Sequence, residues 1–187
     1  LRKIQQESPL RKVLGILIPV AEEVAKENPV TIGILATRAT VDSGAYEREL
    51  RKFLKPRVKV SQKAAPLLVP LVEEGMTNHP VTKIILKEYL TDFQKTDIKH
   101  VILGCTHYTF IKHLIQEEIP DAKIFDSPSI IPKSLQNYLT RHPEIDKKLS
   151  KNGGRRYLTT DDPVRFSNFA KNNLQLSIRP QKIIISD

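Results

Sequence analysis

The chain has 187 residues, and its 30 basic and 21 acidic side chains give a formal net charge of +9. This length suits one domain or two small ones, and a hydrophobic content of 40% is ample for a buried core. No apolar run approaches the length of a membrane span, and the N-terminus lacks the pattern of a secretory signal. A single cysteine excludes an internal disulfide and suits a reducing cytosol, so we expect a cytoplasmic protein with no membrane partner.

The surplus of positive charge is dispersed along the chain. It lies in residues 1–12, 47–63 and 141–156 and in the tail, with few aromatic side chains between the charges. A basic stripe is typical of nucleic-acid binding, whereas scattered Lys and Arg favour a solvated surface. We favour the solvated surface and do not expect nucleic acid as a partner. The same charge would help to attract an anionic dicarboxylate.

The N-terminal residues predict a helix end, an apolar segment and a second helix. Residues 1–7 are typical of the end of a helix, and residues 13–18 form a strand or an apolar crossing segment. Pro19 favours a short helix over residues 20–27, since proline is well tolerated at the first helical position. Because the chain begins with Leu1 and its only methionine is Met76, we interpret it as a fragment.

Strands and helices then alternate from Thr31 to Leu139. Apolar periodicity predicts strands at 31–36, 58–60, 99–104 and 123–125, and helices at 42–54, 67–74, 79–95 and 130–139. This order favours an α/β fold in which a parallel sheet has helices on both faces. The polar segment 144–156, with its paired glycines, indicates a mobile connection. Beyond it we predict a strand, a helix and a closing strand at 156–159, 163–172 and 182–185.

The segment from Val101 to Tyr108 brings several reactive groups together. An apolar run ends at Gly104, and Cys105, Thr106 and His107 follow. In open α/β sheets the ligand crevice lies beyond the carboxyl ends of the strands. We therefore expect Cys105 at a strand-to-helix turn, where the positive end of the helix would lower the pKa of the thiol. A lone cysteine is more often an inert core residue than a reactive one. Two neighbours make the interpretations equally plausible here: a glycine, which lets the backbone approach a ligand, and a nearby histidine.

The other polar candidates also have structural explanations. Glu73, in the predicted helix at 67–74, is equally a solvated helix-end carboxylate. Thr40 is also a plausible cap for a helix that begins at Val41, and His107 could hold down the turn that follows the strand. The sequence contains no P-loop, no dinucleotide-binding glycine fingerprint and no metal-ligand spacing.

Four segments, in one order along the chain, share their pattern with a known family. Leu103-Gly-Cys-Thr-His-Tyr108 is similar to its second catalytic cysteine motif, and Gly33–Tyr46 to its Thr-x-x-Thr segment followed by Ser-Gly-x-Tyr. Pro66–Gly75 is similar to its Pro-x-x-x-Pro-x-x-Glu segment. Thr159-Thr-Asp-Asp-Pro163, with Phe166, resembles its C-terminal Thr-x-Asp-Pro segment. The family is that of the glutamate racemases, within the wider aspartate/glutamate racemase group.

This resemblance implies an isomerase that interconverts L-glutamate and D-glutamate and supplies D-glutamate for peptidoglycan and hence for cell shape. It implies no cofactor: neither pyridoxal phosphate, nor a metal, nor a redox group. Two cysteines stand on opposite faces of the amino acid, and one removes the α-proton as a thiolate while the other delivers a proton as a thiol. The resemblance implies that Cys105 is one of these two residues, that His107 assists it and that Glu73 lies near it. The substrate would be bound by Thr106, Thr37 and Thr40.

Part of the family pattern does not occur in this chain. The first cysteine motif, of the Ala-Cys-Asn-Thr type, is missing, so we expect the chain to be inactive alone. Family architecture implies a remnant of a first domain with a crossover at 1–21, a second domain carrying Cys105 at 22–129, and a segment returning to the first domain at 130–187. That segment should expose apolar surface, and it would fold onto another copy as a homodimer, be disordered or be covered by an N-terminal half.

Two alternatives to glutamate racemisation stay open at this point. One is an aspartate racemase, although the paired threonines and the Pro-Leu-Leu-Val-Pro segment favour the glutamate branch. The other is a non-catalytic domain that binds amino acids or regulates a partner.

Overall fold

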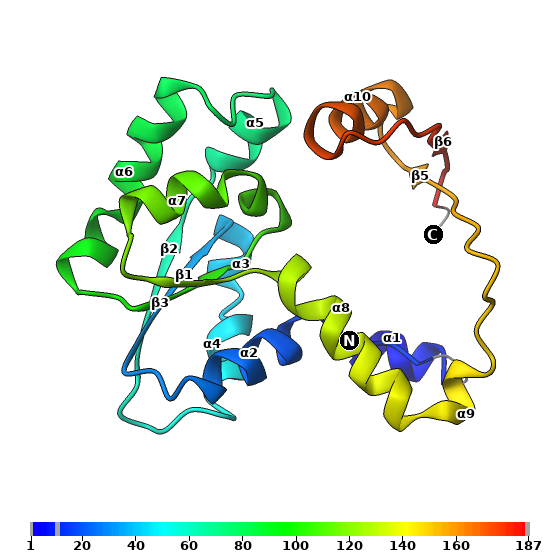
Figure 1. Cartoon of the computed structure of the whole chain (residues 1–187), viewed down its shortest axis with the longest axis horizontal. Coiled ribbons are helices and arrows are strands. Elements are labelled where there is room, and N and C mark those ends of the chain that lie inside the picture. The colour runs from blue at the N-terminus through cyan, green and yellow to red at the C-terminus, as the bar shows by residue number, and fades with distance from the viewer. Residues whose placement is uncertain (1, 10–11, 186–187) are drawn as a thin grey trace.

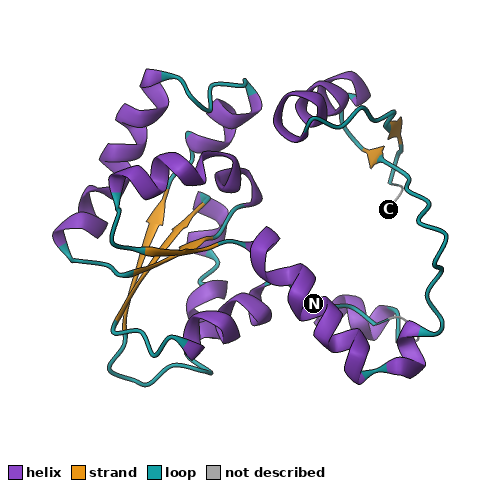
Figure 2. Ribbon diagram, in the orientation of Figure 1, coloured by secondary structure: helices purple, strands orange, loops and turns teal. Residues whose placement is uncertain are grey.

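The chain folds around one parallel sheet that is covered by helices on both faces. A computed structural model describes residues 2–9 and 12–185. Residues 17–126 form the sheet and its covering helices, which we call the sheet unit (Figures 1 and 2). Residues 127–185 leave this unit along a helix and return to it at another, and we call them the C-terminal arm. The predicted α/β class is confirmed.

The sheet has four strands in the order β2-β1-β3-β4, and all neighbouring strands are parallel. The chain leaves β1 in one direction across the sheet and β3 in the other, so a topological switch point lies between β1 and β3. Crevices at such points, beyond the carboxyl ends of the strands, are where open α/β sheets bind ligands. The strands are β1 (Thr31–Ala36), β2 (Lys59–Ala64), β3 (His100–Leu103) and β4 (Lys123–Phe125).

One face of the sheet is covered by α5, α6 and α7. Leu35, Val101 and Leu103 point to this face and pack with buried side chains of the three helices. Gly33 has a packing role, because a Cβ there would lie 2.7 Å from the ring of Phe93. These helices are α5 (Leu68–Glu73), α6 (Pro80–Lys95) and α7 (Lys112–Glu118), and the short 3₁₀ helix η1 (Thr106–Ile111) precedes α7.

The opposite face is covered chiefly by α2 (Leu17–Lys26) and α4 (Ala45–Leu50). Ile32, Ile34 and Ile102 alternate with the residues that point to the first face, as the two-residue period of a strand requires. Burial on both faces explains why the two central strands read as continuous apolar runs rather than as alternating ones. A five-residue helix, α3 (Arg38–Asp42), connects β1 to α4.

The C-terminal arm has few buried side chains. Its first helix has no buried residue, and it leads through α9 to a polar connection. The short strands β5 and β6 precede and follow α10 in the sequence and form a parallel pair. α10 lies near α5 in Figure 1. The elements of the arm are α8 (Ser127–Arg141), α9 (Pro143–Asp146), β5 (Leu158–Thr159), α10 (Pro163–Leu174) and β6 (Gln181–Lys182). At the other end of the chain, α1 (Arg2–Glu7) precedes the sheet unit, and Leu1 of the predicted helix end lies outside the described residues.

Several predicted boundaries were wrong, and the deviations have local causes. The helix predicted at 42–54 is reduced to α4, because α3 already ends at Asp42 and Gly44, with φ of 59°, adopts a left-handed conformation that separates the two helices. The segment at 13–18 does not form a strand, since α2 already begins at Leu17. α8, predicted at 130–139, is longer than predicted and carries Pro132 in its interior, as the predicted helix did. Within the described residues, no helix is long and apolar enough to cross a membrane.

Candidate functional site

The switch point places Thr37 and Cys105 beside each other at the carboxyl edge of the sheet. β1 pairs with β3 up to Leu35 and Leu103, and the Gly104 N–H donates to the Leu35 carbonyl at 2.8 Å. A Cβ on Gly104 would lie 2.7 Å from the Cβ of Ala36. Glycine is therefore required here by the neighbouring strand, and its predicted role in the approach of a ligand stays a prediction.

A chain of polar contacts runs outward from Cys105. Its Sγ lies 3.8 Å from Nδ1 of His107, and Nε2 of His107 lies 3.3 Å from Oε1 of Glu73. Oε2 of the same carboxylate accepts a hydrogen bond from Nη2 of Arg165 at 3.0 Å. A carboxylate can only accept, so a neutral His107 carries its hydrogen on Nε2 and leaves Nδ1 free to accept the thiol proton. The side chains predicted to surround Cys105 are thus brought together.

Burial raises the pKa of Cys105 above its ordinary value. The backbone N–H groups of His107 and Tyr108 act in the opposite direction, and the negative charge of Glu73 adds to the rise. The expected lowering of the thiol pKa is therefore wrong in sign. Cys105 does stand at the start of η1, but this element is a single short 3₁₀ helix, and the N–H groups that it offers do not outweigh the loss of water. At neutral pH the side chain is a thiol.

The three threonines lie at the same edge of the sheet. Thr37 is the N-cap of α3 and accepts a hydrogen bond from the Thr40 N–H at 3.3 Å. The two hydroxyl oxygens are 2.9 Å apart. The cap is therefore Thr37, whereas Thr40 lies inside the first turn and not at the start of a helix from Val41. Thr106 is exposed at the first position of η1, next to Cys105.

Sequence reasoning missed the contributions of Arg165, Phe169 and Tyr108. The rings of Phe169 and His107 are 5.6 Å apart, and the Tyr108 hydroxyl donates to the Ala65 carbonyl at 2.8 Å. Arg165 lies within the segment that carries the Thr-x-Asp-Pro resemblance, yet no local pattern links it to a residue 92 positions away. A cavity of about 310 Å³ lies where α10 meets this site, and its lining includes Glu73, His107, Arg165 and Phe169.

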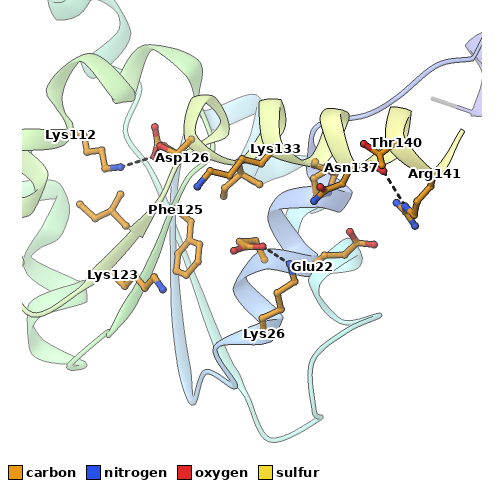
Figure 3. A pocket seen from close by; sticks show the side chains of 16 residues that line it. Glu22, Lys26, Lys112, Lys123, Phe125, Asp126, Lys133, Asn137, Thr140 and Arg141 are labelled. Carbon is orange, nitrogen blue, oxygen red and sulfur yellow. Dashed lines mark hydrogen bonds and ion pairs between the residues drawn. The ribbon is translucent and has the colours of Figure 1, made fainter. Parts of the chain in front are cut away.

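A larger cavity of about 760 Å³ lies apart from Cys105, between α2, β4 and α8 (Figure 3). Two ion pairs lie within its lining. Nζ of Lys112 lies 2.7 Å from Oδ1 of Asp126, a carboxylate only 3% exposed, and Lys26 pairs with Glu23 at 2.7 Å. The Ser129 hydroxyl also donates to Asp126. The hydrogen bond from Ser129 ties the first turn of α8 to the sheet unit, at a carboxylate that Lys112 neutralises.

Comparison with known proteins assigns the family. Residues 1–133 match the family model described as Asp/Glu/Hydantoin racemase. The chain belongs to the Asp/Glu/hydantoin racemase family. Among the members of this family, the glutamate racemase of Sulfurihydrogenibium sp. (strain YO3AOP1) is 39% identical over 94% of this chain and 64% of its own length. That of Persephonella marina is 38% identical over 82% of the chain and 56% of its own length, so the chain spans about half to two thirds of these relatives.

Solved structures of racemases in this family have the same fold. The glutamate racemase of Francisella tularensis in complex with D-glutamate superposes with a TM-score of 0.84 and 30% identity, over 99% of this chain and 68% of that one. The RacE1 isoform of Bacillus anthracis superposes with a TM-score of 0.86 and 28% identity, over 98% of this chain and 69% of that one.

Within the described part of the chain, no three His, Cys, Asp or Glu side chains are grouped to hold a metal.

Proposed function

We propose that this chain provides one half of the acid/base machinery of a glutamate racemase, with Cys105 as the group that exchanges a proton with the α-carbon. The observation that carries the proposal is the contact series from Cys105 through His107 to Glu73 at the switch point of the sheet. The names of the relatives, and the D-glutamate bound in the Francisella structure, favour glutamate as the substrate.

The geometry supports a defined route for the proton. Cys105 begins as a thiol, and a neutral His107 ring accepts the thiol proton on Nδ1 while its Nε2 faces Oε1 of Glu73 at 3.3 Å. The resulting thiolate takes the α-hydrogen of the substrate as a proton, which leaves a carbanion and regenerates the thiol. Return of that proton, or of one exchanged with solvent, to the same face restores the original enantiomer. Interconversion requires a second acid/base group on the opposite face, and Cys105 is the only cysteine in the 187 residues.

The polar groups at the sheet edge would hold the amino acid. The hydroxyl groups of Thr37 and Thr40 form a close pair, and the exposed Thr106 adds a third hydroxyl beside Cys105. Hydroxyls can donate to a carboxylate and accept from an ammonium group, so all three suit the two charged ends of glutamate. In this proposal each threonine binds substrate, Glu73 and His107 assist, and no cofactor takes part.

The biological setting follows from the same proposal. D-glutamate made by this reaction would serve peptidoglycan synthesis and cell shape, and the chemistry would take place in the cytoplasm. We further propose the domain division at 1–21, 22–129 and 130–187. A second copy of the chain, in a homodimer, would be the partner that covers the apolar surface of the last segment.

Solvent deuterium exchange at the α-carbon of L- and D-glutamate tests the proposal. We expect NMR to show exchange into one enantiomer without interconversion, and a chiral assay to detect no new enantiomer. The Cys105→Ser variant should lose the exchange completely. His107→Asn should slow it by about tenfold or more, because general acid–base assistance contributes roughly 10²–10⁴. His113→Asn is the matched control, since His113 is an exposed histidine that contacts Asn78 away from the site.

The other outcomes of this experiment identify the alternatives. Faster exchange with aspartate than with glutamate would replace the substrate and support an aspartate racemase. Binding of glutamate without any exchange at the α-carbon would overturn the catalytic role and support an amino-acid-binding domain. Full racemisation would overturn the assignment of a single working base.

A further inference from the structure

The C-terminal arm reaches the Cys105 site through α10. Arg165, near the start of this helix, donates from Nη2 to Oε2 of Glu73 at 3.0 Å, and the same nitrogen lies 3.9 Å from Oε1 of Glu74. The other oxygen of Glu73 contacts His107 at 3.3 Å. One carboxylate therefore bridges a guanidinium from the arm and an imidazole from the sheet unit.

Aromatic packing fixes α10 in the place that this bridge requires. The Phe169 ring lies 5.6 Å from the His107 ring and 5.4 Å from that of Phe110, the latter edge to face. Phe169 also packs against the buried cluster that includes Leu103 and Ile111. The start of the helix is capped by Asp162, whose Oδ1 accepts from the Val164 N–H at 2.8 Å. Both the position and the orientation of Arg165 are thereby defined.

We propose that Arg165 is a positioning residue of the Cys105 site. Its guanidinium holds the Glu73 carboxylate against His107, and the acid/base behaviour of Cys105 therefore depends on the seating of α10. The inference rests on the proposed function, because only a thiol that moves protons needs its charge state set in this way. Arg165 lies beyond His107 in the contact series, and it acts through Glu73 rather than on the substrate.

Charge accounts for the direction of the effect. The groups that act on Cys105 are His107 and Tyr108 on η1, Glu73 at the end of α5 and Tyr46 on α4. Farther from the thiol, Arg165 contacts Glu73 and Glu74, and Asp161 and Asp162 line the same cavity as Glu73. Among these groups the negative charge of Glu73 raises the pKa of Cys105, and Arg165 offsets that charge. Removing Arg165 leaves the carboxylate uncompensated and makes the thiolate harder to form. The effect should be modest, since the side chain of Arg165 is 56% exposed.

The test measures the rate of Cys105 alkylation by iodoacetamide between pH 6 and 11, in the full chain and without substrate. The chain has one cysteine, so the modified thiol is unambiguous. We expect the midpoint of the pH profile to rise by about half a unit in Arg165→Gln and to return close to the wild-type value in Arg165→Lys. Lys171→Gln is the matched control, because it removes one positive charge from an exposed position of the same helix.

Repeating the Arg165→Gln substitution in a Glu73→Gln chain shows whether its effect on the pH profile of Cys105 depends on Glu73. Glu73→Gln should lower the midpoint, and Arg165→Gln should then shift it by less than half of its effect in the wild-type background. An unchanged or lowered midpoint in Arg165→Gln, with circular dichroism showing a folded chain, would overturn the inference. An equal shift in Lys171→Gln would also overturn it, since any positive charge on α10 would then suffice.

The two proposals fail in distinguishable ways. If the chain exchanges deuterium with glutamate but the alkylation profiles of the Arg165 variants equal that of the wild type, only the proposed role of Arg165 is overturned. A shifted profile in a chain that exchanges no α-proton removes the racemase proposal and, with it, the catalytic meaning of the shift.

Discussion

The sheet unit and the C-terminal arm use apolar side chains in opposite ways. Among the described residues, the buried apolar side chains lie almost entirely in the sheet unit, and only Ala170 and Ile178 come from the arm. Large apolar side chains of the arm are exposed instead, with Val164 at 66%, Ile184 at 91% and Ile185 at 74%. The sheet unit therefore provides most of the stability of the fold, whereas the arm depends on the packing of α8 against α2 and on the few contacts through which α10 meets α5 and η1.

This difference teaches how stability and function are divided in the molecule. Proteins open locally where few apolar contacts hold a segment, and such openings need less free energy than global unfolding. Cys105, His107 and Glu73 belong to the stable unit, whereas Arg165 and Phe169 belong to the weakly held one. A reactive group is thus placed by a rigid scaffold and adjusted by a segment that can open.

The largest expected effect comes from the core of the sheet unit. Phe93 is 1% exposed, and Phe93→Ala should lower the free energy of unfolding by about 3–5 kcal/mol. Val164→Ala, in the arm, should change it by less than about 0.5 kcal/mol because that side chain is exposed. Urea denaturation measures both values. Similar losses for the two variants would show that the arm is as well packed as the sheet unit.

The buried phenol of Tyr46 predicts an alkaline effect within the sheet unit. Burial, followed by the charge of Cys105, raises the pKa of Tyr46 from 10.0 to about 12. The folded state therefore holds the proton more tightly than the unfolded state. The associated stability is fully present below pH 10 and is lost as the pH rises towards 12, by about 2 kcal/mol. Denaturant unfolding from pH 9 to 12 should show this loss in the wild type and a smaller loss in Tyr46→Phe. Equal slopes for both proteins would refute the assignment.

A smaller effect should be confined to the arm. Phe169→Ala removes the ring that packs on Phe110 and His107, and it should lower the protection of α10 amides in hydrogen exchange by about tenfold, or about 1.4 kcal/mol. The amides of β1 and β3 should keep their protection. Leu174→Ala, at the exposed end of the same helix, is the control. Loss of protection throughout the sheet would show that the two regions unfold as one.

Much of the sheet unit could be predicted from its sequence. The strand at Thr31–Ala36 was predicted with its observed limits, because a strand buried on both faces gives an uninterrupted apolar run. The helix at Pro80–Lys95 was predicted to within one residue for a similar reason, the strength of its apolar period. The short strands of the arm were overestimated, since two-residue strands such as β5 leave too few positions for a period to appear.

The candidate site was predictable only in part. The neighbourhood of Cys105, His107 and Glu73 followed from a family resemblance, and the contacts agree with it. The raised pKa of Cys105 did not follow, because burial depends on side chains from several distant segments. The contact of Arg165 with Glu73 could not be predicted from the sequence either, since it arises only when residues 92 positions apart meet in space. The roles of Thr37, Thr40 and Thr106 in substrate binding stay predictions.

The lysines on the outer strands of the sheet have a consequence for the behaviour of the chain at high concentration. Lys59 and Lys63 lie on β2 and Lys123 on β4, which has only three residues. An open strand edge is a template on which another chain can stack, and short, lysine-bearing edges discourage such stacking. Although the arm exposes many apolar side chains, the sheet itself is therefore a poor nucleus for amyloid-like growth. Aggregates of this chain should keep their native sheet and bind thioflavin T weakly.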